Sequence, residues 1–153
     1  MGRGEAMSRF WFLAFLSGVA MAVQGSWNAV LAKAASVWTA LLVLNAAATV
    51  TTAALLVAGG RVPFGLERLH RAPGYVFLAG PVGVLITYLV VVSIPRLGVA
   101  TTATAIVVGQ VGTAALIDHW GLFGLERHPL AWWQLGGVAL LALGAWLLLH
   151  RPG

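Results

Sequence analysis

The sequence predicts an all-α integral membrane protein with five transmembrane helices. Of its 153 residues, 60% are hydrophobic and only 8% are charged, whereas about a quarter of the residues of a soluble domain are charged. Five segments approach the roughly 20 apolar residues that cross a bilayer, and all Lys, Arg, Asp, Glu and His residues lie outside them. A chain of this length is expected to form one domain, 1–153. The five segments are Phe10–Leu31, Val37–Ala58, Gly74–Ile94, Gly98–Ile117 and Leu130–Leu149.

The first segment is interpreted as a span, although the sequence before and after it resembles a signal peptide. Arg3 and Arg9 form a positive amino-terminal region, and Ala32 and Ala34 flank Lys33 as in a cleavage site. About 22 apolar-leaning residues lie between the two features, which is long for the apolar region of a signal peptide.

Two amides of the first segment, Gln24 and Asn28, are one helical turn apart and share a face. An amide that faces lipid loses its hydrogen bonds, at a cost of roughly 2–7 kcal/mol in an apolar medium. The two side chains therefore face protein or a wet cavity. Hydrogen bonds to other helices and binding of a substrate both remain open.

The second and third segments each carry a polar group that needs a partner. Asn45 in the second needs one outside its own helix, unlike threonine, and a bond between helices is favoured there. Tyr88 in the third lies too deep for the aromatic belt, so its hydroxyl either lines a cavity or bonds a neighbouring helix. Pro81 predicts a kink, and Pro95 is expected to end the helix before a tight turn, Pro95–Leu97.

The fourth segment carries small residues along one side and an amide, Gln110, on another. Asp118 follows the segment and is the carboxylate nearest to any span. It could gate the pathway or couple protons there, or it could hold the next loop through a bond from its side chain to the backbone. The fifth segment, with Gly136, Gly137 and Gly144, is expected to serve as scaffold or oligomer contact. The small residues of the fourth segment are Gly98, Thr102, Ala105, Gly109 and Gly112.

The sequence offers no signature of an enzyme. It contains no nucleophile–base pair, no standard metal-ligand spacing and no phosphate-binding glycine loop, so no catalytic residue, metal or cofactor is expected. The nine basic residues lie singly at the ends of segments and form no stripe, which argues against nucleic-acid binding despite the net charge of +5.

The basic residues instead predict the orientation of the chain in the bilayer. With the amino terminus in the cytoplasm, six Lys and Arg residues lie on the cytoplasmic side and three lie on the other, which favours this orientation. Five spans place the two termini on opposite sides. The cytoplasmic set is Arg3, Arg9, Arg61, Arg68, Arg71 and Arg127, and the opposite set is Lys33, Arg96 and Arg151.

Four motifs in order resemble a known family. They are QGSWN at 24–28, PRLG at 95–98, the pair at 109–110 and DHWGLFG at 118–124. With the glycine-rich last span, they make the chain similar to the YdcZ-type family of small bacterial inner-membrane proteins, in the drug/metabolite transporter superfamily. The resemblance covers about Leu16 to Leu149.

The resemblance implies an exporter unit of five spans, like one half of the ten-helix members of the superfamily. It also implies pairing, as an inverted homodimer or with a related five-span chain. Small multidrug members of the superfamily have a glutamate within their first helix, where this chain has Gln24 and Asn28. Proton antiport by that mechanism is therefore not carried over.

We therefore expect a transporter subunit that moves a small polar or amphipathic solute by alternating access. Its binding site is expected to use Gln24 and Asn28, completed by Gln110, Tyr88 and Asn45, with Asp118 in gating or coupling. Two alternatives are a scaffold or accessory subunit that transports nothing, and a lipid flippase.

Overall fold

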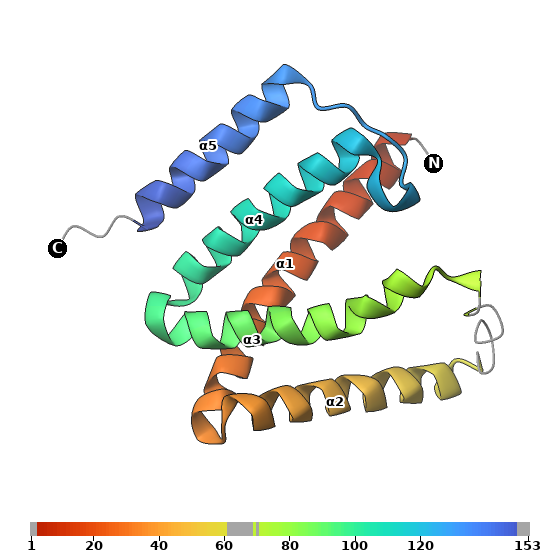
Figure 1. Ribbon diagram of the computed structural model, residues 1–153, viewed down its shortest axis with the longest axis vertical. Coiled ribbons are helices and arrows are strands. Elements are labelled where there is room, and N and C mark those ends of the chain that lie inside the picture. The colour runs from red at the N-terminus through yellow and green to blue at the C-terminus, as the bar shows by residue number, and fades with distance from the viewer. Residues whose placement is uncertain (1–2, 61–68, 70, 150–153) are drawn as a thin grey trace. The chain divides into compact units, whose positions relative to one another are not determined.

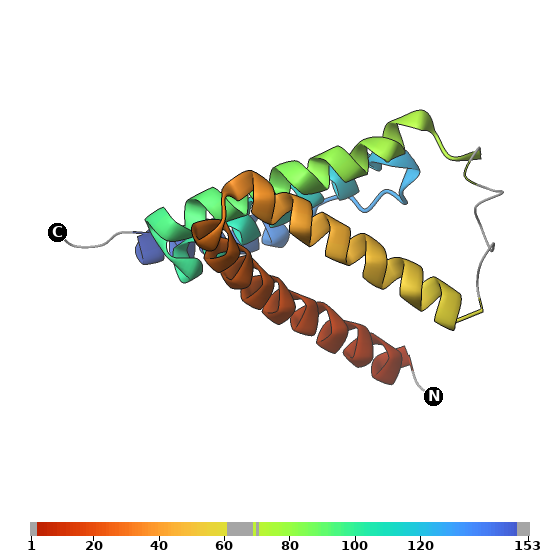
Figure 2. The ribbon, with the colours of Figure 1, turned by 90° about the horizontal axis from the view of Figure 1, so that it is seen from below.

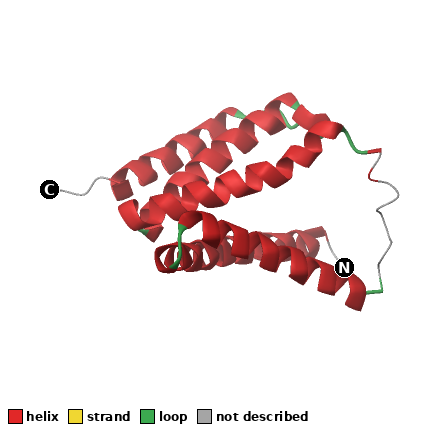
Figure 3. Ribbon diagram, turned by 60° about the horizontal axis from the view of Figure 1, so that its bottom comes forward, coloured by secondary structure: helices red, strands yellow, loops and turns green. Residues whose placement is uncertain are grey.

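The computed structural model describes residues 3–60, 69 and 71–149, which form helices and loops without a strand (Figures 1 and 3). Four stretches are long and apolar enough to cross a membrane, and a shorter apolar helix, Trp132–Leu148, follows them. The predicted class, an all-α membrane protein, is confirmed. The elements are α1 (Arg3–Ala34), α2 (Val37–Ala58), η2 (Gly74–Leu78), α3 (Ala79–Leu97), α4 (Val99–Trp120), η3 (Leu122–Gly124) and α5 (Trp132–Leu149).

Most apolar side chains of the described helices point outward. Trp11, Trp38 and Leu42, for example, are each about 70% exposed. Such a surface would aggregate in water, whereas in a bilayer it meets lipid tails that are equally apolar. Five hydrophobic residues are buried in the described part of the chain: Ala29, Ala40, Leu41, Val91 and Ala145.

The polar side chains on these outer surfaces are largely satisfied within their own helix. Thr49, Thr51 and Thr52 of α2 each donate a hydrogen bond of 2.8 to 2.9 Å to the carbonyl four residues earlier. A threonine bonded in this way leaves no free donor toward lipid. The threonines of α2 therefore need no partner from another helix, as the sequence predicts.

The chain divides into two compact units between Arg96 and Leu97. In the first unit α1 and α2 pack as a hairpin, with Ser36 capping α2. The Ser36 hydroxyl accepts a hydrogen bond from the Thr39 amide at 3.1 Å and donates one to the Thr39 hydroxyl at 2.9 Å. This cap fixes the start of α2 at Val37, the residue that the sequence predicts.

Helix α3 also belongs to the first unit, and it ends later than predicted. The helix contains Pro95 and continues to Leu97, so the prediction that Pro95 ends it is wrong. Proline fits here because its φ suits a helix and its missing N–H breaks only one bond in the final turn. The chain leaves the helical conformation at Gly98, whose φ of 86° favours glycine. At the other end, the 3₁₀ turn η2 gives way to α3 two residues before Pro81.

In the second unit α4 packs against α5. Thr102 near the start of α4 and Ala145 near the end of α5 are buried, and the Thr102 hydroxyl donates to the Gly98 carbonyl at 2.8 Å. Farther along α4 a Cβ added to Gly109 or Gly112 would meet nothing within 4 Å. Within this unit, the small residues of α4 therefore pack closely against other residues only near the start of the helix.

Candidate functional site

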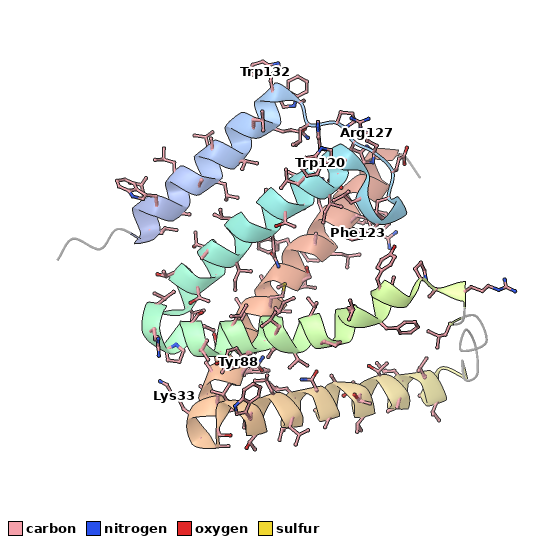
Figure 4. The ribbon with its side chains drawn as sticks, in the orientation of Figure 1. Lys33, Tyr88, Trp120, Phe123, Arg127 and Trp132 are labelled. Atoms are coloured by element: carbon pink, nitrogen blue, oxygen red, sulfur yellow. The ribbon has the colours of Figure 1, made fainter. Side chains whose placement is uncertain are left out.

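The three helices of the first unit come together near the α1–α2 turn (Figure 2). A Cβ added to Gly25 of α1 would lie 3.2 Å from Val90 Cγ1 and 3.4 Å from Ile94 Cδ1 of α3. Helix α3 also contacts α2, because the rings of Tyr88 and Trp38 stack with centroids 5.3 Å apart and an angle of 22°. Figure 4 shows Tyr88 at this end of the unit, near Lys33.

Asn28 is the buried polar residue of this region. The residue is only 5% exposed, and its side chain forms no hydrogen bond with any residue that the structure describes. No fully enclosed side-chain nitrogen or oxygen lacks a partner in the described residues, so the amide atoms of Asn28 keep a small opening to their surroundings. An amide that is buried, unpaired and still reachable is suited to bind a polar group from outside.

The other candidate residues of the first unit differ from Asn28. Gln24 is exposed, although it lies one turn away on the same helix. The Asn45 amide donates to the Leu41 carbonyl of its own helix at 2.8 Å, so the prediction that Asn45 needs a partner outside that helix is wrong. Tyr88 is half-buried against Trp38, and its hydroxyl bonds none of the described residues. The first unit thus contains a buried amide, Asn28, and an aromatic pair on its three packed helices.

Gln110 belongs to the second unit, where it is exposed on α4. Asp118 is also exposed, in the last turn of α4. Its backbone carbonyl, rather than its carboxylate, accepts a hydrogen bond from the following loop, from the His128 amide at 2.8 Å.

The loop between α4 and α5 folds back on the end of α4 (Figure 4). Gly121 ends α4 in the left-handed conformation and its N–H donates to the Ile117 carbonyl. Arg127 donates from Nε to the His119 carbonyl at 2.9 Å, and the Leu130 amide donates to His119 Nδ1 at 3.2 Å. His119 therefore holds the loop at the end of α4 through hydrogen bonds to both its backbone carbonyl and its ring.

The sequence reasoning did not select His119 as a site residue. One signal was available, since histidine in the last turn of a helix often bonds the chain that follows. The glycine at 121 added a second signal, because a left-handed helix end turns the chain back over that last turn.

The family comparison identifies the chain. A family model described as "Putative inner membrane exporter, YdcZ" matches residues 9–147. The comparisons with curated proteins and with solved structures gave no match. The family match spans nearly all of the described helices, including both the Asn28 region and the His119 loop. The chain therefore belongs to the YdcZ family of inner-membrane proteins.

Proposed function

We propose that the protein is an exporter subunit that moves a small polar or amphipathic solute by alternating access. The observation that carries the proposal is Asn28, a residue only 5% exposed whose amide bonds no described residue, on the helix that α3 contacts at Gly25. A scaffold would have no use for such a group, since leaving a buried amide unpaired costs about 1–3 kcal/mol. A passing solute can supply the missing hydrogen bonds.

An aromatic pair in the same unit supports an amphipathic solute. Trp38 and Tyr88 stack between α2 and α3 of the same unit, and Trp38 keeps most of its surface exposed. Flat apolar surfaces in the same unit as a buried amide would favour a solute with an apolar body and one polar group. Gln24 and Gln110, both exposed, would join the site when a second chain covers them.

The remaining parts of the proposal concern assembly and orientation. Transporters are often built from two related halves of opposite orientation, so we propose that the chain works as an inverted homodimer or with a related five-span chain. The amino terminus would lie in the cytoplasm, as the six-to-three distribution of Lys and Arg favours. Asp118, exposed at the end of α4, would take part in gating or coupling on the cytoplasmic face.

A ligand-stabilisation screen of the purified protein tests the proposal. A library of small polar and amphipathic solutes is expected to contain compounds that raise the unfolding temperature of the wild type. Asn28→Leu is expected to fold and to lose that response, since leucine is nearly isosteric but cannot hydrogen-bond. Asn45→Leu is the matched control. The Asn45 amide already bonds Leu41, so the proposed site does not use it and the variant should respond like the wild type.

Two results together would contradict the proposal. If no solute stabilises the wild type and Asn28→Leu lowers its stability, the amide only holds helices together and the scaffold alternative stands. Uptake into proteoliposomes of any solute found, compared between the wild type and Asp118→Asn, then tests gating or coupling.

A further inference from the structure

The ring of His119 is held in one protonation state by its hydrogen bond. Nδ1 accepts from the Leu130 amide at 3.2 Å, and an imidazole nitrogen can accept only when it carries no proton. The ring in this arrangement is therefore neutral, with its proton on Nε2. Adding a proton to Nδ1 would turn two donors toward each other and break the bond.

The bond lies where α5 begins. The next amide along the chain, that of Ala131, donates to Gln134 Oε1 at 2.7 Å. Two consecutive amides before α5 are thus each satisfied by a side chain, one by a carboxamide and one by an imidazole. A carboxamide does not titrate in the physiological range, whereas imidazoles as a class change charge between about pH 5 and 8. Only one of the two bonds can respond to pH.

The rest of the loop is held to the same turn of α4 by bonds that do not titrate in this range. Arg127 Nε bonds the His119 carbonyl at 2.9 Å, and the His128 amide bonds the Asp118 carbonyl at 2.8 Å. A Cβ added to Gly121 would lie 3.2 Å from Arg127 Cβ, which shows how closely the loop returns. Loss of the imidazole bond would therefore free Leu130 and the start of α5 while the middle of the loop stays in place.

We infer that His119 is a pH-sensitive latch that holds the start of α5 against the end of α4 when its ring is neutral and releases it when the ring is protonated. The ionisable groups near it on α4 and the loop are Asp118, Glu126, Arg127 and His128, and the described helix α5 adds none. A role of the latch in regulating export rests on the proposed function. In the predicted orientation the latch would then respond to the cytoplasmic pH. The latch can be measured without export, so its failure and that of the export proposal are separate.

Nuclear magnetic resonance of the full-length protein in lipid nanodiscs tests the latch. Nitrogen spectra of labelled histidine are expected to show His119 at pH 8 as the neutral tautomer with its proton on Nε2. Hydrogen exchange of the Leu130 amide, corrected for the intrinsic pH dependence of exchange, is expected to be faster at pH 5 by about fivefold, the effect of losing one hydrogen bond. The Ala131 amide, bonded to Gln134, is the internal reference and should change less.

Two variants complete the test. His119→Asn places an amide oxygen near the position of Nδ1, so Leu130 should stay protected and its exchange should no longer depend on pH. His128→Asn is the matched control on an exposed histidine whose ring bonds no described residue, and it should keep the wild-type response. The inference is overturned if the proton at pH 8 is on Nδ1, if Leu130 exchange is equal at both pH values, or if His128→Asn rather than His119→Asn removes the response.

Discussion

Two features of the backbone at position 121 require a glycine. Its φ is 63°, and a Cβ placed there would lie 3.2 Å from both Arg127 Cβ and the Leu125 carbonyl oxygen. The left-handed backbone costs an L-residue roughly 1–2 kcal/mol, and the two contacts add to that cost. We expect Gly121→Ala to lower the free energy of unfolding by more than about 2 kcal/mol, measured by thermal or denaturant unfolding in detergent.

The control for this prediction is Gly124→Ala. Gly124 also has a positive φ, 79°, but a Cβ there would meet nothing within 4 Å. Gly124→Ala should therefore lose only the stability that the left-handed backbone costs an L-residue. Equal losses in the two variants would show that the loop does not pack on Gly121.

Asn45 leads to a second prediction at the residue scale, on stability. Its amide bonds only its own helix in the described structure, by the 2.8 Å contact with the Leu41 carbonyl. Replacing it by leucine removes that bond and adds apolar surface toward lipid, two effects that oppose each other. We expect Asn45→Leu to change the free energy of unfolding by less than about 0.6 kcal/mol, the average for a polar contact between membrane helices. A clearly larger loss would reveal a partner on another helix.

Sequence patterns locate these polar residues but not their partners. The spacing of Gln24 and Asn28 correctly places both on one helix, yet only Asn28 is buried. Asn28 lies about one turn beyond Gly25, where α3 contacts α1, and a contact point between helices leaves no periodic signal in either one. His119 escaped prediction for a related reason, since its partner Leu130 is eleven residues away, across a loop without regular spacing.

At the scale of elements, the contact of α1 with α3 depends on the absence of a side chain at Gly25. Val90 and Ile94 of α3 occupy the space where its Cβ would lie. We expect Gly25→Leu to destabilise the protein by about 1–3 kcal/mol through overpacking, as measured by unfolding in detergent. Gly18→Leu on the same helix is the control, because a Cβ at Gly18 would meet nothing within 4 Å.

A second-site variant distinguishes this contact from a general effect of leucine on α1. Val90→Ala removes the atom nearest to the new side chain, so the double variant Gly25→Leu/Val90→Ala should recover part of the lost stability. If the two changes are simply additive, the helices do not meet at this point.

The first and last residues of a helix could be predicted where neighbouring residues in the sequence determine them. Helix α2 spans Val37–Ala58 as predicted, because Ser36 caps its start and Gly59 and Gly60 follow its end. The end of α3 was not predicted correctly, since a proline in a last turn costs little and the change of direction needed the positive φ of Gly98. Helix α5 begins at Trp132 rather than Leu130, because Leu130 is held by His119 before the helix starts.

At the scale of the whole molecule, the absence of charge from the five segments was sufficient to predict the class of fold. Lipid is the solvent for nearly every outward side chain, so the apolar content alone separates spans from loops. The same absence leaves little to specify which helices touch, because the outer and inner faces of such helices are both apolar. The predicted orientation therefore depends on a few basic residues in the loops.

That orientation can be measured directly, because the chain contains no cysteine. Single cysteines at Leu125 and Ala35 lie on exposed loop positions on opposite predicted sides of the membrane. In cells, a thiol reagent that does not cross the membrane should label Ala35→Cys but not Leu125→Cys. Labelling of Leu125→Cys alone would reverse the predicted orientation, and labelling of both would show that chains insert in two orientations, as an inverted homodimer requires.

The charge distribution gives a sharper form of this last prediction. Arg61, Arg68 and Arg71, which follow the second predicted span, supply half of the six predicted cytoplasmic charges. Replacing all three by glutamine leaves three basic residues on each side and removes the bias that selects one orientation. We expect the labelled share of Leu125→Cys to rise toward half in this background. If it stays unchanged, the basic residues do not set the orientation, and an interaction between helices must do so.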